Sequence, residues 1–233
     1  MKALARIVAE ADGRGGTRLS TLYGEAPLLP RQTGPGEVHL VGGAAGPLGG
    51  DELFLEVRVG HGARLTLRTV AASLALPGSG RSVTRVTAAV DGHLDWWPEP
   101  TIAVRGCDHV IDSHVELGPE AALSWREELV WGRHREEGGD LLIRTTVRRA
   151  GQTLFRHDLA LGPSAPGWNG PAVLGGTRTT GTLLAVGPTA ATVAAARQGD
   201  GAAVATMPLG PGLALTTATA PAAHLLRATL TTA

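Results

Sequence analysis

The sequence predicts a mainly β fold, in which β-hairpins stack in a solenoid-like, β-helical arrangement. Three observations predict it. Short runs that alternate apolar and polar residues dominate from about residue 17 to 161, with turns rich in Gly, Pro or Asp-Gly between them. These runs recur with a fixed period. Beyond this β-stack the pattern changes, and a small α+β portion is expected over about 171–233.

The alternating runs are typical of β-strands with one buried face, because successive side chains of a strand point to opposite sides. The clearest runs are "ELFLEVRV", "ARLTLRTV", "VTRVTAAV", "HVIDSHVEL" and "LLIRTTVRR". Helix signals are almost absent from this part of the chain.

The period is 29 residues, which separates Leu65 from Leu94 and Leu94 from Leu123. The same spacing relates Val57, Val86 and Val115. Each unit consists of a strand, a Gly-containing turn and a second strand: "VRVGHGARLTL", "TAAVDGHLDWW", "VELGPEAALSW" and, more loosely, "VRRAGQTLFRHDL". Such periods indicate supersecondary units that bury their apolar sides against each other, which favours a solenoid-like stack over an immunoglobulin-type sandwich. Chance similarity among Val- and Leu-rich strands is the alternative.

The last part of the chain predicts two strands and about two helices. Residues 180–188 and 213–220 have strand patterns. Residues 188–199 have Pro at the first turn, Ala in the middle and Gly at the end, which suits a short helix. Residues 221–231 predict a final helix. We expect this portion to pack on the β-stack, so that residues 1–233 form a single domain.

Composition excludes several classes of function. The chain has 21 Lys plus Arg and 21 Asp plus Glu, so no overall field attracts it to nucleic acid or to a membrane surface. Its only lysine is Lys2, so it lacks the Lys of a nucleotide-binding P-loop. One cysteine, Cys107, cannot form an internal disulfide, and no apolar run reaches the length of a membrane span. A cytoplasmic location is expected.

The glycine-rich stretch at 42–50 precedes an alternating strand. A phosphate-binding loop instead opens a helix whose N-terminus faces the anion. Gly49 and Gly50 are therefore interpreted as positions of positive φ or close backbone approach. Asp51, which follows them, either satisfies amides of the turn or has a functional role.

No self-contained active site is evident. In "CDHVIDSH", residues 107–114, the metal-ligating residue types alternate between the two faces of a strand, which favours a solvated polar face. Glu127 and Glu128 are adjacent, so they would point to opposite faces and could not flank one glycosidic bond. Four tryptophans in the β region are either core residues or an aromatic interface: Trp96, Trp97, Trp125 and Trp131.

Six motifs, in order, give the chain its resemblance to a known family. They are "PL" at 27–28, "GPLGGDEL" at 46–53, "GARLTLRTVAAS" at 62–73, "GHLDWWPEPTI" at 92–102, "EELVWGR" at 127–133 and "GQTLFRHDLAL" at 151–161. Over roughly residues 15–190 the chain resembles the urease accessory protein family UreD, also called UreH.

The resemblance implies a β-stacked fold with two helices and a non-enzymatic role. Members of the family bind the urease apoprotein and recruit UreF, through which the GTPase UreG docks. The assembly inserts nickel into the urease active site in a GTP-dependent step, and a passage for the ion through UreD has been proposed. The partners implied are therefore urease structural subunits, UreF and UreG, with no nucleic acid and no membrane. No tightly bound cofactor is implied, and nickel would be held transiently.

By position in the family motifs, Asp51, Glu127 and His157 are candidate transient nickel ligands. Carboxylate oxygens and an occasional imidazole suit an ion that must be released. The other residues of the family motifs are Gly49, Gly50, Pro98, Gly132 and Arg133. Leu74, Leu76 and Pro77 stand where relatives often have a Lys-x-Tyr-Arg pattern, and "HREEGGD" shifts a Gly-Glu that relatives have after the Gly-Arg pair. Partner contacts at these two places are open.

Two alternatives belong to other classes. The 29-residue repeat is compatible with a β-solenoid hydrolase or lyase acting on carbohydrate, which would need convergent carboxylates in a groove. The segment "CDHVIDSH" is compatible with a metallochaperone that stores nickel directly.

Overall fold

The computed structural model describes residues 1–188, 190 and 201–230. Within them, seven strands form one sheet, called sheet A, in the spatial order β14-β13-β11-β8-β5-β1-β2. β1, β5, β8, β11 and β13 are parallel neighbours, and β2 and β14 close the two edges antiparallel. Their bounds are β1 Lys2–Ala11, β2 Thr17–Gly24, β5 Glu52–Val59, β8 Ser82–Val90, β11 Asp108–Leu117, β13 Asp140–Arg149 and β14 Gln152–Leu161.

The second sheet, sheet B, has ten strands among the described residues, eight of them in the order β16-β17-β15-β12-β9-β6-β4-β3. Two short strands lie off this path: β10 pairs with β12 and β7, both in parallel. The bounds are β3 Leu28–Gly34, β4 Glu37–Gly42, β6 Arg64–Thr69, β7 Ser73–Ala75, β9 His93–Trp97, β10 Thr101–Ala103, β12 Ala122–Trp131, β15 Thr179–Val186, β16 Ala203–Gly210 and β17 Leu213–Ala220.

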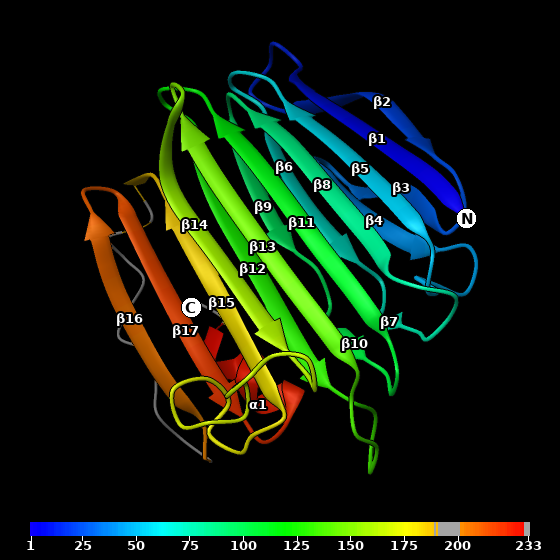
Figure 1. Cartoon of the computed structure of the whole chain (residues 1–233). Helices are drawn as coiled ribbons and strands as arrows, with labels where there is room; N and C mark the ends of the chain where they lie inside the picture. Colours follow the sequence, from blue (N-terminus) through cyan, green and yellow to red (C-terminus); the bar gives the residue numbers. More distant parts are fainter. Residues whose placement is uncertain (189, 191–200, 231–233) are drawn as a thin grey trace.

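The chain alternates between the two sheets from β5 to β13, and this alternation produces a solenoid of about four turns (Figure 1). The predicted mainly β, solenoid-like stack is therefore confirmed. The two strands of a repeat unit are, however, not hydrogen-bonded to each other. β5 lies in sheet A and β6 in sheet B, so each unit is an arch, and each strand pairs with the same strand of the next arch.

The turns of successive arches stack on one another, as their Gly-containing sequences predict. The amides of Asp91 and Gly118 donate to the carbonyls of Val59 and Val90, each at 2.8 Å. Gly92 cannot carry a side chain, because a Cβ there would lie 2.2 Å from the carbonyl oxygen of Ala63 in the turn beneath. A glycine at this position therefore permits the close layering of the turns.

The 29-residue period holds in one sheet and not in the other. In sheet B, Leu65 pairs with Leu94 and Leu94 with Leu123, as the repeat predicts. In sheet A, Val57 pairs with Ala88, two residues beyond Val86. The register between the parallel strands of sheet A therefore departs from the 29-residue spacing, because the connections between arches differ in length.

Several elements of the structure were absent from the sequence prediction. β1 lies between β5 and β2, although the expected β-stack began at about residue 17. β16 is an additional edge strand, and β15 and β17 extend sheet B rather than form a separate layer. The predicted helix at 221–231 is present as α1, Ala223–Leu230. The helix predicted at 188–199 lies almost entirely outside the described residues.

The main core lies between the two sheets and is built from inward-facing Leu, Val, Ile and Ala side chains. Trp96 and Trp125 stack within it, with ring centroids 5.1 Å apart. These two tryptophans are therefore core residues. Trp97 faces the opposite side of sheet B, where the Arg68 guanidinium lies 4.8 Å from its ring centroid.

α1 packs on the outer face of sheet B, against β15, β17 and β12. Leu226 and Leu230 are buried there with Leu183, Ala218 and Ala220. Residues three to four positions apart share one face of a helix, so this short helix is held by a single apolar stripe.

Candidate functional site

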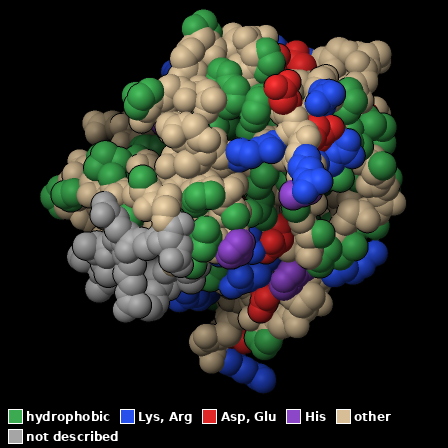
Figure 2. Space-filling view, turned by 90° about the horizontal axis from the view of Figure 1, so that it is seen from below, with side chains coloured by type: hydrophobic (Ala, Val, Ile, Leu, Met, Phe, Trp, Pro, Cys, Tyr) green, Lys and Arg blue, Asp and Glu red, His purple; other side chains and the backbone are tan. Residues whose placement is uncertain are grey.

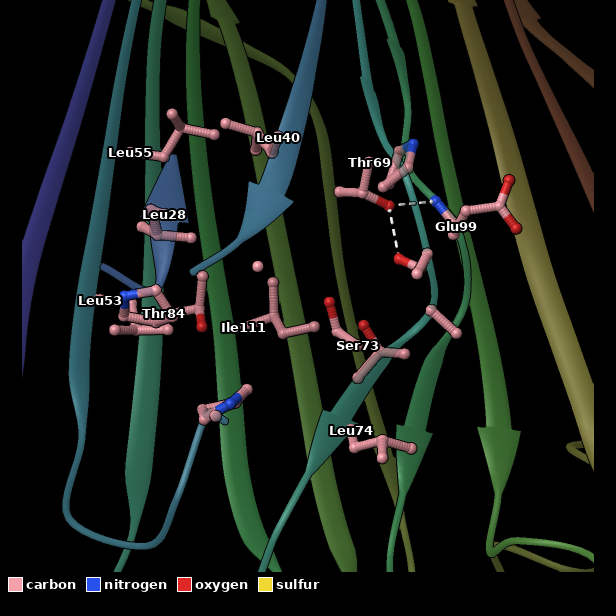
Figure 3. A pocket seen from close by; sticks show the side chains of 18 of the residues that line it. Leu28, Leu40, Leu53, Leu55, Thr69, Ser73, Leu74, Thr84, Glu99 and Ile111 are labelled. Carbon is pink, nitrogen blue, oxygen red and sulfur yellow. Dashed lines mark hydrogen bonds between the residues drawn. The ribbon is translucent and has the colours of Figure 1, made fainter. Parts of the chain in front are cut away.

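A cavity of about 340 Å³ lies between the two sheets, at the end where β8 and β11 begin. Its wall is largely apolar, with Leu28, Leu53 and Leu55 gathered on one side and Glu99 on the other (Figure 3). Thr84, Ile111 and Ser73 lie between these two sides (Figure 3). A second apolar cluster, which includes Leu141, Ile143 and Leu161, lies at this same end, so the cavity is a local space beside packed side chains.

The cavity passes through sheet B where strand pairing is interrupted. β12 pairs with β9 over Ala122–Trp125 and with β10 over Leu129–Trp131, so residues 126–128 face an unpaired segment. That segment contains Pro98 and Pro100, which have no backbone N–H to donate to a ladder. Thr69 bridges the gap by accepting a hydrogen bond from the Glu99 amide at 2.9 Å. The interruption leaves an aperture in the sheet.

Glu127 and Glu128 both line the cavity, although successive side chains of a strand point to opposite faces. Glu127 points between the sheets, where it meets Thr145 of β13, and Glu128 points outward, where it meets Arg227 of α1. The prediction that these two side chains diverge is confirmed.

Glu127 is a buried carboxyl group that two neutral side chains contact. Trp125 Nε1 donates to it at 3.0 Å, and Thr145 Oγ1 lies 2.9 and 3.0 Å from its two oxygens. Burial raises the pKa of Glu127, and the hydrogen bonds from Trp125 and Thr145 offset this only in part.

Thr145 belongs to a polar row that crosses sheet A on its inner face. In register, Ser113 of β11 pairs with Thr145, and Thr145 pairs with His157 of β14. The Ser113 hydroxyl is buried, lines the cavity and has no hydrogen-bond partner among the described residues. The structure thus brings His157 next to the hydroxyl that binds Glu127. His157 is half-buried, and burial lowers its pKa.

His109 is the imidazole that lines the cavity itself. Its Nδ1 lies 2.8 Å from Ser82 Oγ, and Nε2 lies 3.5 Å from Thr84 Oγ1. Burial lowers the pKa of His109 to about 4, so the ring is neutral at pH 7. A neutral imidazole is the form that can ligate a metal.

Outside the aperture, Glu128 and Glu99 are joined by one guanidinium. Arg227 Nε and Nη2 donate to the two oxygens of Glu128 at 3.1 and 2.9 Å, and Nη1 donates to Glu99 at 2.6 Å. Arg126 Nε also lies 2.9 Å from Glu128. The bonds to Glu128 and then Glu99 raise the pKa of Arg227, which stays charged.

Asp51 lies at a corner of the sandwich near the cavity rather than within its lining. Its Oδ2 accepts the Leu48 amide at 2.8 Å, and its Oδ1 contacts the amino group of Met1. Burial raises the pKa of Asp51, but these two hydrogen bonds outweigh it and hold the pKa below its usual value. The turn-capping role considered for Asp51 is present. The nearby Gly49 is a position of close backbone approach, because a Cβ there would lie 2.6 Å from Gly78.

The remaining motif residues divide between two places. Pro98 lines the cavity, as do Leu74 and Leu76, which stand where relatives often have other residues. Gly132 and Arg133 lie beside a second, polar cleft of about 530 Å³, lined by Trp131, Trp168 and several charged side chains. Arg133 there holds Glu136 through two hydrogen bonds of 2.7 and 2.9 Å.

The segment 107–114 divides between the two faces of β11 as expected. Asp108 pairs with Arg81 at 2.9 Å, and Asp112 lies 3.1 Å from His114, both on the outer face of sheet A. In the described part of the chain, no three His, Cys, Asp or Glu side chains gather closely enough to hold a metal ion. Burial raises the pKa of the Cys107 thiol to about 11, so it remains protonated.

Reasoning from sequence missed Ser113, Glu99 and Arg227, and it considered His109 only as part of the segment 107–114. His109 and Ser113 carried a usable signal, since they are polar residues on the apolar side of a strand pattern. Arg227 carried a weaker one, as the only Lys, Arg, Asp or Glu in its predicted helix. Glu99 had no such sequence signal, because it lies in an unpaired segment between two prolines.

Comparison with known proteins identifies the family. The whole chain, residues 1–233, matches the family profile described as UreD urease accessory protein. The chain belongs to the UreD family. A urease accessory protein UreD of Streptomyces avermitilis is 44% identical over 239 residues, which cover 99% of this chain and 95% of the relative. UreD of Streptomyces coelicolor is 44% identical, covering 97% and 93%, and UreD of Frankia alni is 40% identical, covering 99% and 91%.

The face of the molecule seen in Figure 2 shows no dominance of one charge. Seen from below the view of Figure 1, acidic, basic and histidine side chains mix in one band, with hydrophobic side chains to its sides (Figure 2). Among the described residues, no helix has the length and apolar character needed to cross a membrane.

Proposed function

We propose that this chain is a non-enzymatic scaffold for maturation of the nickel centre of urease. It binds apo-urease and recruits UreF, through which the GTPase UreG docks, so that nickel is inserted in a GTP-dependent step in the cytoplasm. Membership of the UreD family supports this proposal. The chain takes part as one domain over residues 1–233, and nickel is cargo that it holds transiently.

The observation that supports transit of the ion is the cavity that crosses sheet B. Its polar lining includes the carboxyl group of Glu127, the imidazole of His109 and the unpartnered hydroxyl of Ser113. Oxygen and imidazole donors suit a borderline cation such as Ni²⁺. One carboxyl group and one neutral imidazole offer few ligands, so such an ion is held weakly, which is what a route requires and a storage site does not.

Of the three sequence-derived ligand candidates, Glu127 has the strongest support, since it lines the cavity. We place His157 on the route beyond Glu127, because His157 is the register partner of Thr145 and Thr145 is hydrogen-bonded to Glu127. Asp51 is assigned to one end, because its carboxylate lies beside Gly46, and Gly46 lines the cavity.

The first test is urease activation in a host that carries the urease structural genes and the other accessory genes, with and without this chain. We expect nickel-dependent activity to collapse without the chain. We also expect the purified chain to capture apo-urease and UreF. Unchanged urease activity in its absence would refute the proposal.

The route is tested by Glu127→Gln, which keeps the side-chain shape and an oxygen that can accept from Trp125 and Thr145. We expect activation of urease to fall at least about tenfold, with capture of apo-urease unchanged. Glu116→Gln is the matched control, because Glu116 lies on the outer face of β11 and pairs only loosely with Arg148 at 3.6 Å. Equal activation by the two variants would remove Glu127 from the route.

The alternatives have less support. A carbohydrate hydrolase or lyase needs two free convergent carboxylates, whereas Glu99 and Glu128 are both bonded to Arg227. Turnover of any glycan above background, in a panel of candidate substrates, would support the hydrolase or lyase instead. Direct nickel storage predicts micromolar or tighter binding that is lost in a His109/His114 double variant. Equilibrium dialysis distinguishes it from the weak binding that a route predicts.

A further inference from the structure

The outer end of the cavity already holds a positive charge supplied by the protein. Arg227 forms a two-pronged bond with Glu128 and a third bond with Glu99, at distances of 2.6 to 3.1 Å. Both residues line the cavity, and the Glu128 carboxylate is buried between the guanidinium groups of Arg227 and Arg126. Bidentate guanidinium–carboxylate pairs are among the stronger and more directional hydrogen bonds in proteins. The guanidinium therefore occupies the position from which a cation would neutralise both groups.

We infer that Arg227 masks a cation-binding carboxylate pair, and that Glu99 and Glu128 accept a divalent cation only when α1 moves the guanidinium away. This inference rests on the proposed function, since it adds a regulated end to the same route. We call α1 a latch in this sense: Arg227 neutralises Glu99 and Glu128 until the helix is displaced.

The surrounding charges support an exchange of one cation for another. Arg126 lies beside Glu128, and both Arg227 and Arg68 repel its charge, which together with burial lowers the pKa of Arg126. Once Arg227 leaves, two carboxylates face a single close guanidinium, so the outer end carries an uncompensated negative charge. A divalent cation compensates that charge, as the guanidinium did before. Carboxylate oxygens are accepted ligands of Ni²⁺ and of harder divalent ions.

The cavity supplies a second indication that a polar guest belongs there. Ser113 is 1% exposed, and its hydroxyl has no partner among the described residues although it lines the cavity. Buried hydroxyls are normally hydrogen-bonded, so an unpartnered one that faces a cavity indicates a water molecule or a hydrated ion. Ser113 and the carboxylate pair thus mark an inner and an outer position along one space.

The helix that bears Arg227 lies outside the β-ladders of sheet B. α1 has eight residues, and its apolar anchors are Leu226 and Leu230. Sheet B is complete without it, because α1 contributes no strand and packs on the outer face. Displacement of α1 therefore leaves every β-ladder intact.

The test uses the purified full chain and Ni²⁺ as the probe. Arg227→Met removes the charge and keeps a long apolar side chain, whereas Arg227→Lys keeps a cation in place. We expect Arg227→Met to bind Ni²⁺ at least about tenfold tighter than the unaltered chain in equilibrium dialysis. Arg227→Lys should bind like the unaltered chain, and Arg227→Met combined with Glu99→Gln should lose the gain.

Thermal unfolding gives a second readout that does not depend on affinity alone. Arg227→Met should unfold at a lower temperature than the unaltered chain, and Ni²⁺ should restore part of the loss. If Arg227→Met does not fold, Arg227→Gln takes its place, because the amide still donates hydrogen bonds while lacking charge. No gain in Ni²⁺ affinity in a folded, uncharged variant would overturn the latch. The proposed function would be unaffected by that result, since urease activation in the host tests it separately.

Discussion

The two ends of the interior differ in what the same strands bury. Toward its C-terminal end, β8 points Ala88 and Val90 inward, and β11 points Val115 and Leu117 inward. Near their starts, the same strands bury Ser82, His109 and Ser113. One end is therefore a close-packed apolar core, and the other surrounds a cavity with buried polar groups. Burying polar groups costs free energy unless they are hydrogen-bonded. Ser82 and His109 are hydrogen-bonded to each other, so the difference teaches that, of these three groups, Ser113 is the one whose burial stays uncompensated among the described residues.

The largest effect that sharpens this comparison is expected from Leu94→Ala in the apolar end. Leu94 is fully buried in the main core, so the truncation removes packing and leaves a cavity. We expect the free energy of unfolding to fall by about 3 kcal/mol, measured by urea denaturation. A loss below about 1 kcal/mol would mean that this end is also loosely packed.

A smaller effect is expected from the titration of His109 at the polar end. Burial lowers its pKa in the folded protein to about 4, from the ordinary histidine value of 6.5. The stability that this depressed pKa contributes is present above pH 6.5 and is lost as pH falls toward 4. Between pH 7.5 and pH 5 we expect the protein to lose about 2 kcal/mol through this group.

The control for His109 is His109→Gln, which cannot titrate and keeps hydrogen-bonding atoms for Ser82 and Thr84. We expect the difference in unfolding free energy between the two proteins to change with pH over this window, since the remaining groups titrate alike in both. Parallel stability curves for the two proteins would show that His109 is not held neutral by burial.

The smallest effect is expected from Ser113→Ala. The Ser113 hydroxyl is buried without a partner among the described residues, so its removal relieves an unsatisfied polar group. We expect stability to rise by up to about 1 kcal/mol, in contrast to the loss at Leu94. A decrease of similar size would indicate a bound water molecule that the hydroxyl holds.

Much of the fold could be predicted because it follows from local patterns. The alternation of apolar residues predicted the strands, and the spacing of Leu65, Leu94 and Leu123 predicted their register in sheet B. The pairing of Val57 with Ala88 could not be predicted, because register in sheet A depends on the lengths of the connections between arches. The arrangement of each unit as an arch also required the structure, since a Gly-containing turn suits a hairpin equally well.

The candidate site was predictable only in part. Glu127 was identified from its motif, and its divergence from Glu128 from strand geometry. The cavity depends on an interruption of pairing beside Pro98 and on Arg227, which lies 99 residues from Glu128 in sequence. Neither local periodicity nor residue spacing encodes a contact of that separation. Asp51 and His157 were identified as motif positions, but their distance from the cavity lining was not predictable.

The offset between the sheets restricts how this chain could change length. Over two turns sheet A advances from Val57 through Ala88 to Val115, and sheet B from Leu65 through Leu94 to Leu123. Both paths span 58 residues, although only sheet B divides them equally. The next turn of sheet A advances from Val115 to Val147, which is 32 residues, so the spacing differs again. The connections between arches take up these differences while the ladders stay regular, and an insertion that lengthens the solenoid is therefore expected to be tolerated in the connections rather than in the strands.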